Sequence, residues 1–205
     1  MSKRADGLLG EGKLLEAADS QSEKGELLEV VDDSNKVVRI ASMDEVHVMQ
    51  LPHRTVHVLL YNARGLLVQK RAKQLRNSPE HWDLSCAEHV QPHESYEAAA
   101  YRGLKEELGI ENVELKKVFD WQRFEQVPPH QVKKHISLTA LYAGFYDGKF
   151  TVDRHEIAEA KFLPLEEIRG MLERGEKLTY WFQKEMNAIQ EKGLWKSIGQ
   201  KKWGG

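Results

Sequence analysis

Residues 88–110 read Glu-His-Val-Gln-Pro-His-Glu-Ser-Tyr-Glu-Ala-Ala-Ala-Tyr-Arg-Gly-Leu-Lys-Glu-Glu-Leu-Gly-Ile. The segment from Ser95 to Leu108 predicts a helix, because apolar residues are spread along it and Gly109 stands where a helix C-cap glycine belongs. On such a helix positions 103, 106 and 107 share one face, since they are spaced i, i+3 and i+4. Metal-binding side chains at these positions would converge.

Glu106 and Glu107 are adjacent carboxylates near the C-terminus of this helix. The helix macrodipole disfavours negative charge there, and a cation bound between the two carboxylates would relieve the repulsion. Mg²⁺ suits them best, because it prefers oxygen ligands and keeps waters and substrate phosphates in its coordination shell. Taken alone, such a pair is more often two exposed glutamates on a solvated helix face.

The composition supports a folded chain with a buried core. Of the 205 residues, 40% are hydrophobic and 30% are charged, which argues against wholesale disorder. No run approaches the roughly 18–20 consecutive apolar residues of a membrane span. The N-terminus lacks the apolar region of a signal peptide. A membrane protein and a signal peptide are both disfavoured.

The charges nearly balance, with 30 Lys+Arg against 32 Asp+Glu and a net charge of −2. Nucleic-acid binders carry a basic excess, so we expect no nucleic-acid partner. Cys86 is the single cysteine, which excludes an intramolecular disulfide and points to a reducing, cytoplasmic compartment. The nine histidines form no Cys/His zinc pattern.

Outside residues 88–110 the sequence predicts an α+β fold with a mixed sheet. Two β-branched runs flank an Asp/Ser/Asn cluster and read as a hairpin, and Ser42 caps a short helix that Pro52 ends. A second hairpin turns at Gly65. Strands are expected at 27–31, 37–40, 55–61, 66–71, 115–124, 135–145 and 160–163, and helices at 164–174 and 180–191.

Residues 88–110 resemble the Nudix box, whose pattern is Gly-x5-Glu-x7-Arg-Glu-U-x-Glu-Glu-x-Gly-U, with U an aliphatic residue. Seven of its nine defined positions match, and Glu88 and Gly103 are the two departures. A pattern with so many fixed positions is far more specific than a lone glycine loop. The matching residues are Glu94, Arg102, Leu104, Glu106, Glu107, Gly109 and Ile110.

The likeness extends to residues 28–190 and is greatest to the Nudix subgroup similar to isopentenyl-diphosphate isomerase. Residues 53–58, 67–71 and 82–85 look like the strands and loop before the box, and residues 162–167 like the end of the fold. The resemblance implies an α/β/α sandwich with a mixed β-sheet. We therefore expect a Nudix domain at 28–190 with an N-terminal β-hairpin, a flexible tail at 1–27 and a C-terminal tail at 191–205.

The resemblance also implies the chemistry of the site. Nudix enzymes hold Mg²⁺ or Mn²⁺ against a diphosphate, and water attacks one phosphorus. By position Glu106 and Glu107 become metal ligands and catalytic residues, while Arg102 and Glu94 match the residues of an orienting ion pair. A further carboxylate often comes from a later loop, where Glu156 and Glu159 are the candidates, although solvated charges would read the same way. Lys70 and Arg71 either approach a phosphate or end a solvated strand.

Two departures put metal affinity and rate in doubt. Gly103 stands where the family has a glutamate that often binds metal or assists the general base, and a glycine inside a helix costs about 1 kcal/mol relative to alanine. Glu88 adds a carboxylate elsewhere in the same motif, so it either compensates as a metal ligand or is merely exposed. His93 replaces a frequent glycine, which restricts the loop if that position needs a positive φ.

Isomerase activity is disfavoured. The isomerase has a cysteine two residues before a metal-binding histidine, and a Glu-x-Glu pair in a later strand. His89 matches the histidine, but Ala87 stands at the cysteine position, and Cys86, one residue out of register, would face the opposite side of a strand. His135 and Ser137 lie near the expected Glu-x-Glu, while His53, His57 and His135 read as ordinary strand residues.

The sequence therefore predicts a metal-dependent hydrolase of a small-molecule diphosphate, such as a nucleoside diphosphate derivative, with activity lowered by Gly103. The alternative is a catalytically silent Nudix domain that binds a diphosphate ligand or a protein partner. A homodimer is left open, because many relatives form dimers.

Overall fold

A computed structural model describes residues 25–126 and 134–191 of the chain. The predicted C-terminal tail, apart from Glu191, and most of the predicted N-terminal tail lie outside these residues, so those predictions stay untested. The elements are β1 Leu27–Val31, β2 Val37–Ser42, α1 Met43–Met49, β3 His53–Asn62, β4 Gly65–Arg71, β5 Trp82–Asp83, β6 Cys86–His89, α2 Tyr96–Leu108, β7 Lys116–Gln126, β8 His135–Phe145, β9 Ile157–Leu163, α3 Leu165–Glu173 and α4 Tyr180–Glu191.

The sheet is mixed and centres on β3. This strand pairs antiparallel with β1, β4 and β6 and parallel with β8, while β4 carries β5 and β9. β3 and β4 pair only beside their turn, at Tyr61↔Leu66 and Asn62↔Gly65, and then take different partners. Only glycine fits at position 65, because its φ is 127° and a Cβ would lie 1.9 Å from the Leu163 carbonyl oxygen.

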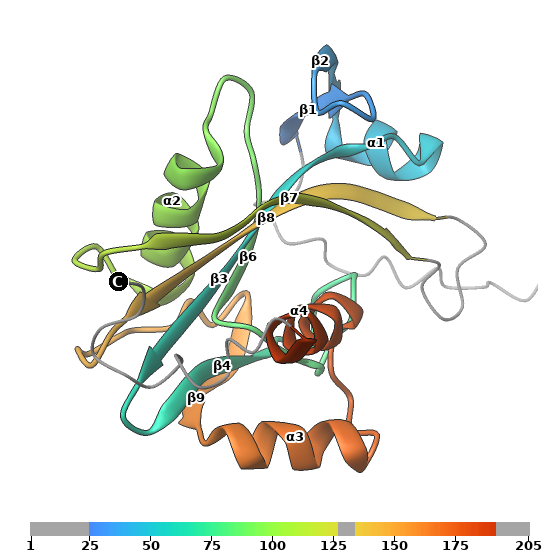
Figure 1. Cartoon of the computed structure of the whole chain (residues 1–205). Helices are drawn as coiled ribbons and strands as arrows, with labels where there is room; N and C mark the ends of the chain where they lie inside the picture. Colours follow the sequence, from blue (N-terminus) through green and yellow to red (C-terminus); the bar gives the residue numbers. More distant parts are fainter. Residues whose placement is uncertain (1–24, 127–133, 192–205) are drawn as a thin grey trace, which may run out of the picture.

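Helices cover both faces of this sheet, so the predicted α/β/α sandwich is confirmed (Figure 1). Alternate residues of β3 serve the two cores: Val56 and Val58 pack with α2, whereas Leu59 and Tyr61 pack with α3 and α4. The fully buried side chains that α3 and α4 contribute to the second core are Ile168, Phe182 and Met186. None of the helices in the described residues is long and apolar enough to cross a membrane.

The predicted N-terminal hairpin and short helix are confirmed. β1 and β2 pair antiparallel, and the Ser42 side chain caps α1 by accepting a hydrogen bond from the Glu45 amide at 3.2 Å. Leu28, Val46 and neighbouring apolar residues form a small third core beneath α1. Val30 pairs with His53 of β3, so α1 lies beside the start of the central strand.

The predicted box helix is confirmed in detail. Ser95 caps α2 by accepting from the Ala98 amide, and Gly109 ends it in the left-handed conformation with a φ of 63°. The amides of Thr151 and Asp153 donate to the last carbonyls of α2, at Leu108 and Glu107. The segment that leads to β9 is thereby fixed against the C-terminal end of the helix.

Candidate functional site

One cavity of about 750 Å³ is lined by side chains from several strands of the sheet, among them β3, β4, β6 and β8. Among its lining residues are Glu88, Arg102, Glu106 and Glu107 of the 88–110 stretch, and Glu156 from the segment before β9. Glu94 does not line the cavity and acts on it through Arg102. The structure thus brings most of the predicted site residues to one place.

Arg102 is the hub of this group. Its guanidinium donates to both carboxylate oxygens of Glu94, each at 3.0 Å, and to the His89 carbonyl at 2.7 Å. The same guanidinium lies 3.2 Å from Glu88 and 3.1 Å from Glu106. The orienting ion pair with Glu94 is therefore present, and it ties the loop before α2 to the helix.

Glu107 is buried beside the cavity. It accepts a hydrogen bond from the Gln69 amide at 2.8 Å and one from the Cys86 thiol at 3.1 Å. Burial raises the pKa of this carboxyl well above its ordinary value, and repulsion from Glu88 and Glu156 raises it further. A cation beside Glu107 would relieve both effects.

Glu88 fills the space that Gly103 leaves open. A Cβ at position 103 would lie 2.7 Å from the Cys86 sulfur and 3.1 Å from the Glu88 Cβ. The Glu88 side chain is only 17% exposed, so it is not merely a surface residue. Position 103 on the helix thus lacks the carboxylate of the family pattern, while position 88 on the facing strand β6 carries a carboxylate that the pattern lacks.

The Glu88 carboxyl has its pKa raised from 4.5 to about 8, because burial outweighs the attraction of Arg102. Between these two values the folded protein holds a proton that the unfolded chain lacks. The contribution of Glu88 to the free energy of unfolding therefore falls as the pH rises from 4.5 to 8. In metal-free protein, the stability of Glu88→Gln relative to wild type should increase by up to about 1.4 kcal/mol per pH unit in this window. Urea unfolding at pH 5, 6, 7 and 8 measures this, and parallel curves would show that Glu88 is already ionised.

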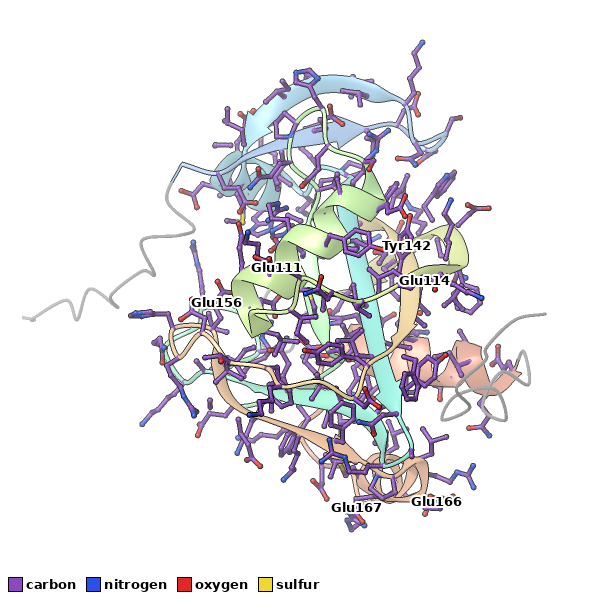
Figure 2. All side chains as sticks on the ribbon, turned by 90° about the vertical axis from the view of Figure 1, so that its left-hand side faces the viewer. Glu111, Glu114, Tyr142, Glu156, Glu166 and Glu167 are labelled. Carbon is purple, nitrogen blue, oxygen red and sulfur yellow. The ribbon has the colours of Figure 1, made fainter. Side chains whose placement is uncertain are left out.

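The two candidates for a further carboxylate, Glu156 and Glu159, lie in different surroundings. Glu156 lines the cavity and lies beside the C-terminal end of α2, in the region labelled in Figure 2. Glu159 is instead paired with Lys161 at 2.8 Å on the exposed side of β9. Glu156 is therefore the further carboxylate that can reach a ligand in the cavity. Of the two basic candidates, Arg71 lines the cavity and Lys70 does not.

A second feature of the cavity is a group of four rings, His47, His53, His89 and His135, which we call the histidine cluster. Five of its ring pairs have centroids between 4.9 and 5.9 Å apart. From the sequence, His53 and His135 were interpreted as ordinary strand residues. Their proximity follows from strand register, since β3 pairs with both β6 and β8, and register is not visible in the sequence.

The histidine cluster has the properties of a nitrogen-donor metal site. The Nδ1–H of His53 donates to the Leu51 carbonyl at 3.1 Å, which leaves the lone pair of Nε2 for the cluster. That Nε2 and the Nε2 of His47 are buried and have no hydrogen-bond partner in the part of the chain that the structure describes. Burial lowers the pKa of His89 to about 3 and that of His135 to about 4, with help from His47, so these rings are neutral.

The described residues contain two groups whose ligand atoms all lie within 4.8 Å of one another. One is His47, His53 and His89, and the other is Glu26, Glu88 and His89. The predicted metal ligands Glu88, Glu106 and Glu107 do not form such a group. Glu106 accepts from Arg102, and Glu107 accepts from Gln69 and Cys86. A metal held by these three would require Glu106 to leave Arg102.

The register of β6 agrees with the prediction for its cysteine. Cys86 lies in the core against α2, and Ala87 lines the cavity on the other face of the strand. Burial raises the pKa of the Cys86 thiol well above its ordinary value, and the Glu107 charge adds to this. The cavity therefore presents a methyl group at the position where the isomerase has its cysteine. Ser137 lines the same cavity.

Comparisons with known proteins agree with the geometry. A model of the NUDIX domain matches residues 51–182. Isopentenyl-diphosphate Delta-isomerase 2 of Photorhabdus laumondii is 28% identical over 80% of this chain and 92% of its own length. An uncharacterised Nudix hydrolase of Listeria monocytogenes is 31% identical over 65% of this chain and 76% of its own length.

Solved structures show the same fold. A Deinococcus radiodurans protein superposes with a TM-score of 0.62 at 20% identity, over 81% of this chain and 98% of its own. The MutT protein of Methanosarcina mazei superposes with a TM-score of 0.57 at 22% identity, over 69% of this chain and 95% of its own. At these identities the likeness supports the fold alone.

Proposed function

The chain belongs to the Nudix family, and from that premise we propose that it is a divalent-metal-dependent hydrolase that cleaves a diphosphate linkage in a small molecule. The observation that carries the proposal is the convergence of Arg102 and of the buried carboxyls Glu88 and Glu107 on one cavity. Buried acids that repel one another are a destabilising arrangement, and a bound cation offsets that cost.

The oxygen donors that line the cavity suit a divalent ion. Once Glu106 leaves Arg102, Glu106, Glu107 and Glu88 would hold Mg²⁺ or Mn²⁺, with Glu156 as a further oxygen donor. The ion would supply Lewis-acid polarisation of the diphosphate and lower the pKa of a bound water. In this proposal Glu88 takes over from the glutamate that Gly103 replaces. The histidine cluster offers a second position, and its nitrogen donors favour Zn²⁺, Fe²⁺ or Co²⁺ over Mg²⁺.

In this proposal the Arg71 guanidinium supplies a positive charge for the diphosphate. Arg71 lines the cavity, where its Nε donates to the Asn77 carbonyl at 3.1 Å and its Nη1 lies 3.4 Å from the Oδ2 of Asp83. Its guanidinium also lies over the Trp181 ring, at 5.6 Å from the centroid. These contacts hold the side chain in place, so a phosphate can be bound without further ordering of a long side chain.

The decisive experiment is hydrolysis of a diphosphate panel by protein first stripped with EDTA. The panel includes ADP-ribose, ADP-glucose, nucleoside triphosphates and isopentenyl diphosphate. We expect release of phosphate or a mononucleotide with Mg²⁺ or Mn²⁺ and a loss of at least 10²-fold in EDTA, because the metal carries several kcal/mol of charge stabilisation. Conversion of isopentenyl diphosphate to its five-carbon isomer, without release, would contradict a hydrolase and support the isomerase.

A silent wild-type protein that still binds a diphosphate would support the alternative of a Nudix domain retained for binding. The predicted small-molecule partner, the homodimer and the cytoplasmic location stay predictions. A dimer can be measured by sedimentation at the concentrations used in the assay.

A further inference from the structure

A buried pair of polar residues adjoins the cavity on the side of α4. The Nδ1 atom of His57, in the middle of β3, lies 2.8 Å from the Oε1 atom of Glu185 on α4. His57 is 5% exposed and Glu185 is 1% exposed. The proposed chemistry of the box does not use either residue.

The surroundings of Glu185 are those of an apolar core. Its neighbours on the buried face of α4 are Phe182, Met186 and Ile189. The Oε2 atom of Glu185 is buried and has no hydrogen-bond partner among the described residues. Burying a carboxylate here costs several kcal/mol, and an apolar side chain of similar size would serve packing better. Packing alone therefore does not account for the pair.

His57 connects this buried acid to the cavity. His57 lines the cavity, as does Ala87, its partner in the β3–β6 register. Glu185 occupies the Nδ1 side of the ring, so Nε2 is the nitrogen that can face the cavity. A carboxylate that accepts from Nδ1–H fixes this tautomer and leaves a lone pair on Nε2. The same carboxylate stabilises the imidazolium that forms when Nε2 takes a proton.

Of the other elements around His57, β8 carries a titratable group, His135, whose pKa His57 helps to lower. The Phe124 ring of β7 lies 5.8 Å away, and the register partners Ala87 and Leu141 are apolar. Among the described residues, Glu185 is therefore the acidic side chain in hydrogen-bond contact with the ring.

We propose that His57 is a catalytic proton acceptor of this hydrolase and that Glu185 is its positioning residue. The inference rests on the proposed function. As the water oxygen bonds to phosphorus, the bridging P–O bond breaks and its electron pair stays on the leaving phosphate oxygen. The water proton passes to Nε2 of His57. In the family, the glutamate that Gly103 replaces often assists the general base. His57 would supply a proton acceptor in a chain that lacks this glutamate.

The test compares His57→Gln, Glu185→Gln and Glu185→Leu with wild type, on the ADP-ribose and wider panel described above, with saturating Mn²⁺. His57→Gln should lower kcat about 10²-fold, with KM within threefold, and should remove the acidic limb of the kcat–pH profile. Glu185→Gln keeps an acceptor for Nδ1–H but removes the charge, so it should shift that limb to lower pH. His81→Gln, at an exposed histidine outside the cavity, is the matched control and should match wild type.

Glu185→Leu separates catalysis from folding. Glu185→Leu leaves the Nδ1–H of His57 without an acceptor, so its folding is checked by urea unfolding, and the folded variant should lose at least tenfold in kcat. Activity in Glu185→Leu and His57→Gln within threefold of wild type, with an unchanged pH limb, would overturn the inference while leaving the hydrolase intact. Absence of turnover by the wild type would remove the proposed function and this inference together.

Discussion

Replacing Glu107 with glutamine should lower diphosphate hydrolysis about 10³-fold while leaving the metal-free protein at least as stable as wild type. The loss in rate corresponds to about 4 kcal/mol of transition-state stabilisation, the scale expected when a metal ligand is removed. The gain in stability follows from burial, because the uncharged amide avoids repulsion from Glu88 and Glu156. A glutamine can still accept from Gln69 and turn its amino group toward the Cys86 sulfur.

The matched control is Glu97→Gln, an exposed glutamate in the first turn of the same helix. It changes the net charge by the same amount, so it should leave both the rate and the metal requirement unchanged. The measurements are kcat across a Mg²⁺ titration and urea unfolding in EDTA. Activity in Glu107→Gln at the wild-type level would exclude Glu107 as a metal ligand and shift attention to the histidine cluster.

Most of the fold could be predicted because its signals are local. Ser95 and Gly109 mark both ends of α2, and the structure places the N-cap and the left-handed C-cap at these residues. The hairpin turn at Gly65 likewise needs only a positive φ. The strand at 160–163 was predicted too short, since β9 begins at Ile157, where pairing with β4 continues past the recognisable apolar run.

The site residues that lie on α2 or in the loop before it could be predicted. Glu94, Arg102 and Glu107 have fixed spacing in the motif, so their place in the candidate site could be predicted from sequence. The histidine cluster and the His57–Glu185 pair could not, because each depends on elements far apart in the chain. His57 and Glu185 are separated by 128 positions, and an isolated histidine in an apolar strand gives no sign of its partner. His93 was identified as a site that would be restricted by a positive φ, and its φ is 65°.

The glycine at position 103 looked like a loss when only the sequence was considered, but the structure gives it a steric reason. Restoring the family residue by Gly103→Glu should therefore destabilise the protein by about 1–3 kcal/mol, and by more where the new acid is charged, rather than improve it. A new Cβ would lie 2.7 Å from the Cys86 sulfur and 3.1 Å from the Glu88 Cβ. Overpacking of this kind costs about 1–3 kcal/mol, and a third acid beside Glu88 and Glu107 adds a charge penalty.

Gly103→Ala distinguishes overpacking from the charge penalty, because alanine adds the Cβ without adding a charge. Its gain of about 1 kcal/mol in helix propensity should be offset by the contact with Cys86, and Cys86→Ala should relieve that contact in a double-mutant cycle. Exchanging the acids, as Glu88→Gly with Gly103→Glu, removes the Glu88 side chain from the path of the new glutamate. Because the contact with Cys86 remains, we expect the exchange variant to recover part of the stability and Mn²⁺-dependent turnover that Gly103→Glu loses. If Gly103→Glu alone were as stable as wild type and faster, the glycine would be a plain catalytic defect and Glu88 would not be its replacement.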